Sequence, residues 1–324
     1  MTDDTRPGTR SRVPGRVFRV LVAVGLTAWL VVRASPADVA ASLAPAIPGW
    51  VVAAVGLVIV DRTLMAYRWL LLLRAIEPGR HVPLGAVVRV FFVSTFVGSF
   101  LPGSVGGDAA RAYGLSKLGV PTADALASVV VDRLLGVVSL LLAAAVGLVV
   151  VRRLVEGWAI AAIAGLGLAV AVAALLLLFD SRVLSGGVRW LTAARMPRLE
   201  RLANKGLTAI RQYGRHRRQL TTVLAVSMVV QGLRILQAWC LGLALALTVG
   251  PSWYVAFVPV VVLVMLLPIS VAGLGTSQAA FQVLFGTVGV AAPDALALSI
   301  LFLGLGLVGN LPGGLLVAFG KRGS

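Results

Sequence analysis

Charged residues within otherwise apolar segments are the first candidates for chemistry in this sequence. Two such segments contain the triplet Val-Asp-Arg, in VIVDRTLM and in SVVVDRLL, and a third charged pair follows a break in an apolar run. Ionisable groups inside hydrophobic segments are costly, so by default they mark a functional site. We predict that three aspartates and three arginines form one cluster: Asp61, Arg62, Asp108, Arg111, Asp132 and Arg133.

This cluster predicts a site for a phosphate-bearing lipid. Neighbouring residues on a helix do not face each other, so each Asp and Arg of a triplet is expected to find its partner on another element. The planar guanidinium of arginine binds two phosphate oxygens at once and stays charged in a low dielectric. A structural alternative stays open, in which the six charges neutralise each other and hold the helices together.

The segment LPGSVGGDAARAY, residues 101–113, interrupts an apolar run with a proline and three glycines. Its glycines allow backbone N–H groups to approach an anion, and a helix that begins near Asp108 would direct its positive end into the same space. The break therefore predicts a polar, anion-tolerant pocket. Its additional site residues are Pro102, Gly103, Gly106 and Gly107.

A second broken segment, LPISVAGLGTSQAAF at residues 267–281, repeats the first with an offset of 166 residues. Both contain Leu-Pro-x-Ser-Val-x-Gly after an apolar run. Paired segments interrupted by Gly and Pro in corresponding parts of a chain indicate a transporter binding site. The candidate residues of the second segment are Pro268, Ser270, Gly273, Gly275 and Gln278.

The composition is that of an integral membrane protein. Of the 324 residues, 59% are hydrophobic and 13% are charged, and the mean hydropathy is +0.98. Lipid offers no hydrogen-bond partner to an exposed backbone, and the sequence lacks the alternation of polar and apolar residues typical of barrels. The net charge of +17 is explained by membrane orientation, so we expect no nucleic-acid partner.

We therefore predict an all-α fold, a polytopic membrane helix bundle with about six full spans and two Gly/Pro-broken, re-entrant hairpins in an inverted repeat. A span needs about 20 apolar residues. The two broken regions are 84–116 and 253–290. The full spans are expected at 17–34, 47–74, 124–151, 158–179, 220–248 and 294–319.

The distribution of basic residues predicts the orientation of the chain. The N-terminal arm and the loop 180–219 are rich in Lys and Arg, so both should face the cytoplasm. This holds if 84–116 enters and leaves from the cytoplasmic side and 253–290 enters from the outside. The alternative, that one broken region crosses fully, also stays open, and Arg152 and Arg153 favour it.

The same reasoning defines the domain organisation and the location. Residues 1–16 are predicted to be a disordered basic cytoplasmic tail, 17–319 the membrane domain, and 320–324 a second cytoplasmic tail. Within the domain, 180–219 should carry a basic amphipathic helix on the cytoplasmic face. The chain is thus expected to be a multi-pass protein of the cell membrane.

Three motifs resemble a known family, the lysylphosphatidylglycerol synthase transmembrane region, also described as flippase-like integral membrane proteins. They are LPGSVGGDAARAY, SVVVDRLLGVVSLLL and LPISVAGLGTSQAAF, in that order. The resemblance covers about residues 17–319. It departs at Ser277 and Gln278, where the family usually has Arg-Glu, and this removes an ion pair from the second hairpin.

The resemblance implies translocation of a lipid between leaflets or a closely related lipid-handling role, and it does not fix the lipid. From the arginine cluster we expect an anionic phospholipid or a polyprenyl phosphate as partner. The chain has no Walker motif for ATP hydrolysis, and no soluble synthetase domain follows the membrane part. We therefore expect no catalytic residue, no metal, no cofactor and no aminoacyl transfer. Two alternatives stay open: an enzyme that uses Asp108 or Asp132, and an accessory subunit of a partner synthase. A homo-oligomer is also open.

Overall fold

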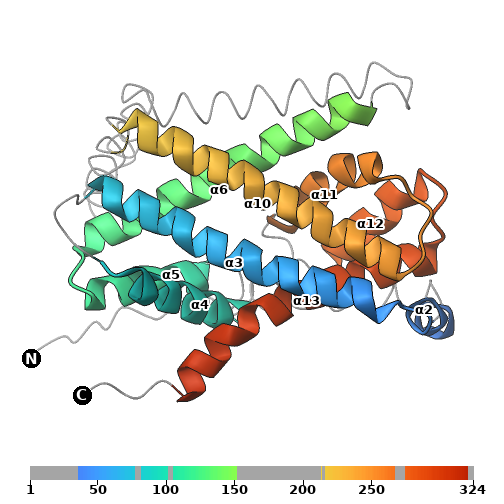
Figure 1. The fold of residues 1–324 in the computed structure, drawn as a ribbon, viewed down its shortest axis with the longest axis horizontal. Coiled ribbons are helices and arrows are strands. Elements are labelled where there is room, and N and C mark those ends of the chain that lie inside the picture. Colours follow the sequence, from blue (N-terminus) through green and yellow to red (C-terminus); the bar gives the residue numbers. More distant parts are fainter. Residues whose placement is uncertain are drawn as a thin grey trace, which may run out of the picture.

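The computed structural model describes residues 36–76, 82–100, 105–151, 213, 216–266 and 274–319, drawn as the coloured ribbon in Figure 1. The regular structure of this part of the chain is entirely helical, which confirms the all-α prediction there. The predicted spans 17–34 and 158–179, most of the loop 180–219 and both tails lie outside the described residues.

The helices form two sets of four in the same order, each a long helix, two short helices and a second long helix. A short helix, α2 (Pro36–Leu43), precedes them. The first set is α3 (Pro48–Ile76), α4 (Leu84–Phe100), α5 (Val105–Lys117) and α6 (Thr122–Val151). The second set is α10 (Arg217–Ala244), α11 (Pro251–Leu266), α12 (Thr276–Gly286) and α13 (Ala292–Phe319).

The two sets pack as an inverted repeat. Helix α3 packs along α10, its own counterpart, and the two run in opposite directions in Figure 1. Helix α4 packs on α13 just as α11 packs on α6, so that each contact recurs when the sets are exchanged. A pseudo-two-fold axis generates this pattern. The repeat predicted from two short motifs therefore extends over four helices in each half.

Both broken regions form helical hairpins that begin and end at one end of the bundle. Helices α4 and α5 contact each other, and so do α11 and α12. Figure 1 shows the first hairpin beside the end of α3 and the second beside its beginning. The hairpins thus enter from opposite ends, as the re-entrant prediction requires, and neither crosses the bundle.

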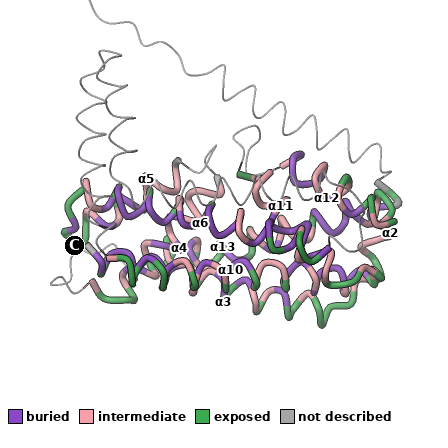
Figure 2. Tube along the Cα trace, turned by 90° about the horizontal axis from the view of Figure 1, so that it is seen from above, coloured by how far each residue is buried: buried purple, intermediate pink, exposed green. Residues whose placement is uncertain are grey.

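Within the part of the chain that the structure describes, four helices are long and apolar enough to cross a membrane, namely Pro48–Ala75, Thr122–Val151, Arg217–Ala244 and Ala292–Phe319. They correspond to four predicted spans. The prediction 220–248 ends four residues too late, because the chain turns after Ala244 and Ala246 takes a φ of 54°. Figure 2 shows exposed residues along the outer surface of α3, and large apolar side chains such as Val52 and Val60 face outward there.

Tyr213 belongs to the region 180–219, for which a helix on the membrane surface is predicted. Its side chain is 1% exposed. It packs in a hydrophobic cluster with Leu72 of α3, Leu135 of α6 and Val223 of α10. Three helices converge at this end of the bundle, so the ring is buried by protein and not by lipid.

Glycines at equivalent positions allow the two sets to approach closely. Gly147 of α6 lies against the backbone of α11 at Val255, and Gly313 of α13 lies against the carbonyl of Phe92 in α4. The two glycines are 166 positions apart, the offset of the sequence repeat. A methyl group at either position would clash with backbone atoms, which cannot move aside as a side chain can.

We expect Gly147→Ala and Gly313→Ala each to destabilise the bundle by about 1–3 kcal/mol, the usual cost of overpacking. The measurement is the thermal unfolding midpoint of the purified protein in detergent. Gly56→Ala is the matched control, because a methyl group there meets no atom within 4 Å. Equal midpoints for all three variants would show that the close approach of the repeats is not required.

Candidate functional site

Asp132 of α6 is the centre of a buried ion-pair group. Its Oδ1 lies 2.6 Å from Nη2 of Arg68 in α3, and its Oδ2 lies 3.1 Å from Nη1 of Arg111 in α5. The Asp132 side chain is 3% exposed. One carboxylate therefore joins three helices and balances one of the two cationic charges beside it.

The two arginines of this group are held on several sides. The guanidinium of Arg111 lies 5.1 Å from the ring centroid of Trp69 and 4.6 Å from that of Phe91. Nη1 of Arg68 donates a hydrogen bond of 3.1 Å to the Ser227 hydroxyl of α10. Cation–π contacts are strongest where water is excluded, so the surroundings fix both guanidinium groups in place.

A second ion pair joins Asp108 of α5 to Arg133 of α6. Nε and Nη2 of Arg133 donate to the two carboxylate oxygens at 3.0 Å and 2.9 Å, the bidentate geometry that arginine favours. The Arg133 side chain is 43% exposed. Asp132 and Arg133 therefore both find partners on other helices, as predicted.

Asp61 of α3 lies between two arginines, and here the sequence prediction is partly wrong. Its Oδ1 lies 3.5 Å from Nε of Arg234 in α10, but its Oδ2 also pairs with the adjacent Arg62 at 3.1 Å. The rule that neighbours do not face each other concerns the directions in which side chains leave the helix. The arginine side chain is long enough to turn back toward Asp61 and Met65, whose sulfur lies 3.6 Å from Arg62 Nη1.

Arg62 also connects the two repeats through an amide. Its Nε donates to Oδ1 of Asn310 in α13 at 3.1 Å, and Nδ2 of Asn310 donates to the Ser99 hydroxyl in α4 at 2.8 Å. These bonds link α3, α13 and the end of α4. The tip of the first hairpin is thereby connected to the charged cluster.

The cluster carries an excess of two positive charges. It contains three aspartates and five arginines, namely Asp61, Asp108, Asp132, Arg62, Arg68, Arg111, Arg133 and Arg234. The structural alternative of six charges that cancel does not describe this group, because Arg68 and Arg234 add two uncompensated cations.

Arg68 and Arg234 were missed, although the sequence contains a signal for both. Arg68 follows Arg62 by six residues in the same apolar span, and Arg234 lies in the middle of a span that has no other charged residue after its first turn. The cost of a charge in lipid applies to them as it does to the Val-Asp-Arg triplets.

One glycine of the first hairpin has a packing role that the sequence does not predict. A Cβ on Gly107 would lie 3.2 Å from Gly98 Cα and 3.0 Å from the Ser94 carbonyl oxygen, so Gly107 allows α5 to pack on α4. Gly106 is half-buried in the first turn of α5, where Asp108 lies as expected. Pro102 and Gly103 lie outside the described residues.

The second hairpin has buried polar groups without charge. Oε1 of Gln278 accepts hydrogen bonds from the Gly275 N–H at 2.6 Å and from the Ser277 hydroxyl at 3.0 Å. Gln278 therefore caps α12, and Gly275 supplies the φ of 80° that this turn requires. Pro268, Ser270 and Gly273 are outside the described residues.

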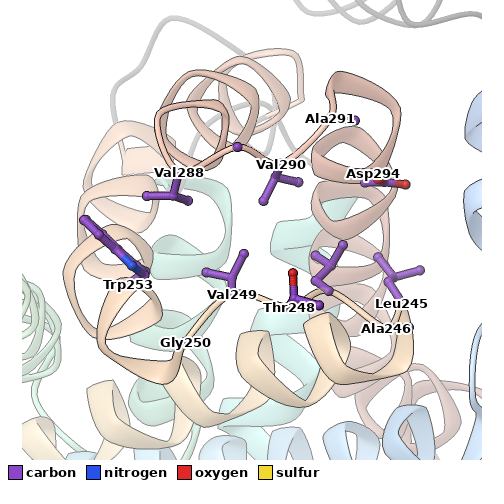
Figure 3. A pocket seen from close by; sticks show the side chains of 12 residues that line it. Leu245, Ala246, Thr248, Val249, Gly250, Trp253, Val288, Val290, Ala291 and Asp294 are labelled. Carbon is purple, nitrogen blue, oxygen red and sulfur yellow. The ribbon is translucent and has the colours of Figure 1, made fainter.

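A cavity of about 370 Å³ lies between the α10–α11 and α12–α13 loops. Figure 3 shows Trp253 on one side of it and Asp294 on the other. None of its lining residues belongs to the charged cluster. Among the residues that the structure describes, no group of three His, Cys, Asp or Glu could hold a metal ion.

Comparison with known proteins agrees with the resemblance seen in the motifs. A family model described as the lysylphosphatidylglycerol synthase TM region matches residues 16–313. None of the curated proteins compared with the chain matches it.

We expect Asp132→Asn to destabilise the protein by about 3–5 kcal/mol, because it leaves Arg68 and Arg111 buried without a counter-charge. Asp108→Asn is the matched control and should have a much smaller effect, since Arg133 is largely accessible. Thermal unfolding in detergent measures both. An Asp132→Asn variant as stable as Asp108→Asn would contradict the central role of this carboxylate.

Proposed function

Because the chain belongs to the lysylphosphatidylglycerol synthase transmembrane family, we propose that it moves a phosphate-bearing lipid between the leaflets of the membrane. The lipid is a phospholipid or a polyprenyl-phosphate-linked lipid. The observation that carries the proposal is the excess of two positive charges inside a bundle of apolar helices.

An uncompensated charge is costly in a low dielectric, and an anion that enters the cluster removes this cost. The phosphate of a lipid brings a negative charge to this depth while its chains stay in the hydrocarbon. The guanidinium groups suit phosphate oxygens in both geometry and charge. A lipid headgroup is therefore the ligand that fits the cluster and its surroundings.

The inverted repeat supports transport over catalysis. In transporters with such repeats, substrates bind near the centre, between elements that enter from opposite sides. All three aspartates of the cluster are paired with arginine, which leaves none as a free general base. We therefore propose facilitated movement of the lipid, with no catalytic residue.

We also propose that the basic end of the bundle faces the cytoplasm. Arg74, Lys117, Arg217 and Arg218 lie at helix ends on this side, whereas Asp294 lies at the first turn of α13 on the other. Positively charged residues are enriched on the cytoplasmic side of membrane proteins. Helix α13 ends at the basic side in Figure 1, so in this orientation its C-terminal end faces the cytoplasm, as proposed for the cell membrane.

We expect reconstituted protein to accelerate leaflet exchange of a fluorescent anionic phospholipid in proteoliposomes, and we expect Arg62→Ala to abolish the acceleration. Arg218→Ala removes the same charge from an exposed position outside the cluster and should retain activity. A parallel assay with a labelled polyprenyl phosphate identifies the lipid class. The absence of acceleration for both lipids would contradict the proposal.

The orientation has its own test. In cells, a cysteine introduced by Lys117→Cys should react with a membrane-impermeant maleimide only after permeabilisation, whereas Thr248→Cys should react in intact cells. The native Cys240 is buried, so labelling of the protein without an introduced cysteine gives the background signal. The reverse labelling pattern would show that the basic end faces outward.

A further inference from the structure

We propose that the anion binds between Arg62 and Arg234, beside helix α13, and that the site accepts a group with one negative charge, such as a phosphate diester. The proposal rests on the proposed function for the lipid as the source of this group. It assigns a structural role to the ion pairs of Asp132, although one partner of Asp132, Arg111, lies in the first broken segment.

The two excess charges lie in different surroundings. Arg68 and Arg111 share Asp132, and the side chains of all three are at most 6% exposed. Arg62 and Arg234 share Asp61, and their side chains are 16% and 18% exposed. The remaining pair, Asp108 and Arg133, is neutral. An excess charge that a ligand can reach therefore lies at Arg62 and Arg234.

Besides Asp61, the two arginines share one further acceptor, and it is a poor one. Nη1 of Arg62 and Nη2 of Arg234 both point at the sulfur of Met65, at 3.6 Å and 3.3 Å. A thioether is uncharged and a weak acceptor. Asp61 is 3.5 Å from Arg234, compared with 2.6 Å between Asp132 and Arg68. Two guanidinium groups thus converge on Met65, where an anionic oxygen would be a better acceptor than the thioether.

Helix α13 leaves room beside Arg62. A Cβ on Gly306 would lie 3.9 Å from Nη2 of Arg62 and would contact no other described helix, whereas a Cβ on Gly309 would lie 2.8 Å from the Val58 side chain. Asn310 on the same helix holds Nε through its amide oxygen. The asparagine therefore positions the guanidinium, while the glycine at 306 keeps the approach to Nη2 free of a side chain.

The charge balance sets the class of ligand. Asp61 offsets one of the two arginines, so a group with one negative charge completes the balance at this site. A phosphate diester in a lipid headgroup carries one negative charge. Inorganic phosphate offers the same oxygens without a lipid, so the two sources must be tested separately.

The test is ligand-dependent thermal stabilisation of the full chain in detergent, titrated with inorganic phosphate or with dioctanoyl phosphatidylglycerol. Dioctanoylglycerol, which lacks the phosphate, is the control ligand. We expect Arg234→Gln to raise the ligand concentration at half-saturation about tenfold, because one charge-assisted contact is lost. Asp61→Asn should lower this concentration by a similar factor, because the substitution removes the carboxylate that competes with the ligand.

Two further variants keep the test decisive. Arg133→Gln removes one positive charge from the Asp108–Arg133 pair. It should leave the ligand concentration at half-saturation unchanged. Gly306→Leu fills the space beside Arg62 without a change in charge and should weaken binding even if Arg234→Gln does not fold. Weaker or unchanged binding in Asp61→Asn, or equal losses in Arg133→Gln and Arg234→Gln, would overturn the assignment.

Failure of the proposed anion site and failure of the proposed transport function give different experimental results. Headgroup binding that depends on Arg234 without leaflet exchange would support this site and contradict the proposed function. Leaflet exchange that Arg234→Gln and Gly306→Leu leave intact would support the function and overturn this site. Binding of inorganic phosphate without binding of phosphatidylglycerol would overturn the lipid as the source of the anion.

Discussion

Charge inside an apolar bundle must be balanced, and this constraint shapes the centre of the molecule. Asp132 balances one of two arginines and in doing so joins α3, α5 and α6. Asp61 does the same between α3 and α10. Each carboxylate holds helices together and leaves one cation in excess. The ion pairs that join the helices therefore also leave the positive charge on which the proposed anion site depends.

The inverted repeat supplies a symmetric frame for an asymmetric site. Equivalent glycines, Gly147 and Gly313, bring equivalent helices together in the two halves. The first hairpin carries Asp108 and Arg111, whereas the second carries the capping amide of Gln278. The symmetry thus provides two hairpins from opposite ends, and of the two hairpins the first carries the charges that join the cluster.

Much of the fold could be predicted from the sequence, because lipid allows few backbone structures and because proline and glycine mark the breaks. The sequence also predicted that Asp132 and Arg133 each find a partner on another helix, as Arg133 does in Asp108. The partners of Asp61 were not, because side-chain length and three-dimensional packing decide them. The role of Gly107 likewise depends on Gly98 and Ser94 of α4, which no local pattern in α5 reveals.

The most direct test of the proposed anion site is a cryo-electron microscopy map of the full chain in nanodiscs that contain phosphatidylglycerol. We predict density for a phosphate group in contact with the guanidinium groups of Arg62 and Arg234, with acyl chains that extend outward between the helices. A map in which Arg62 and Arg234 contact only Asp61, Met65, Asn310 and water, while lipid occupies the outer surface alone, would contradict it.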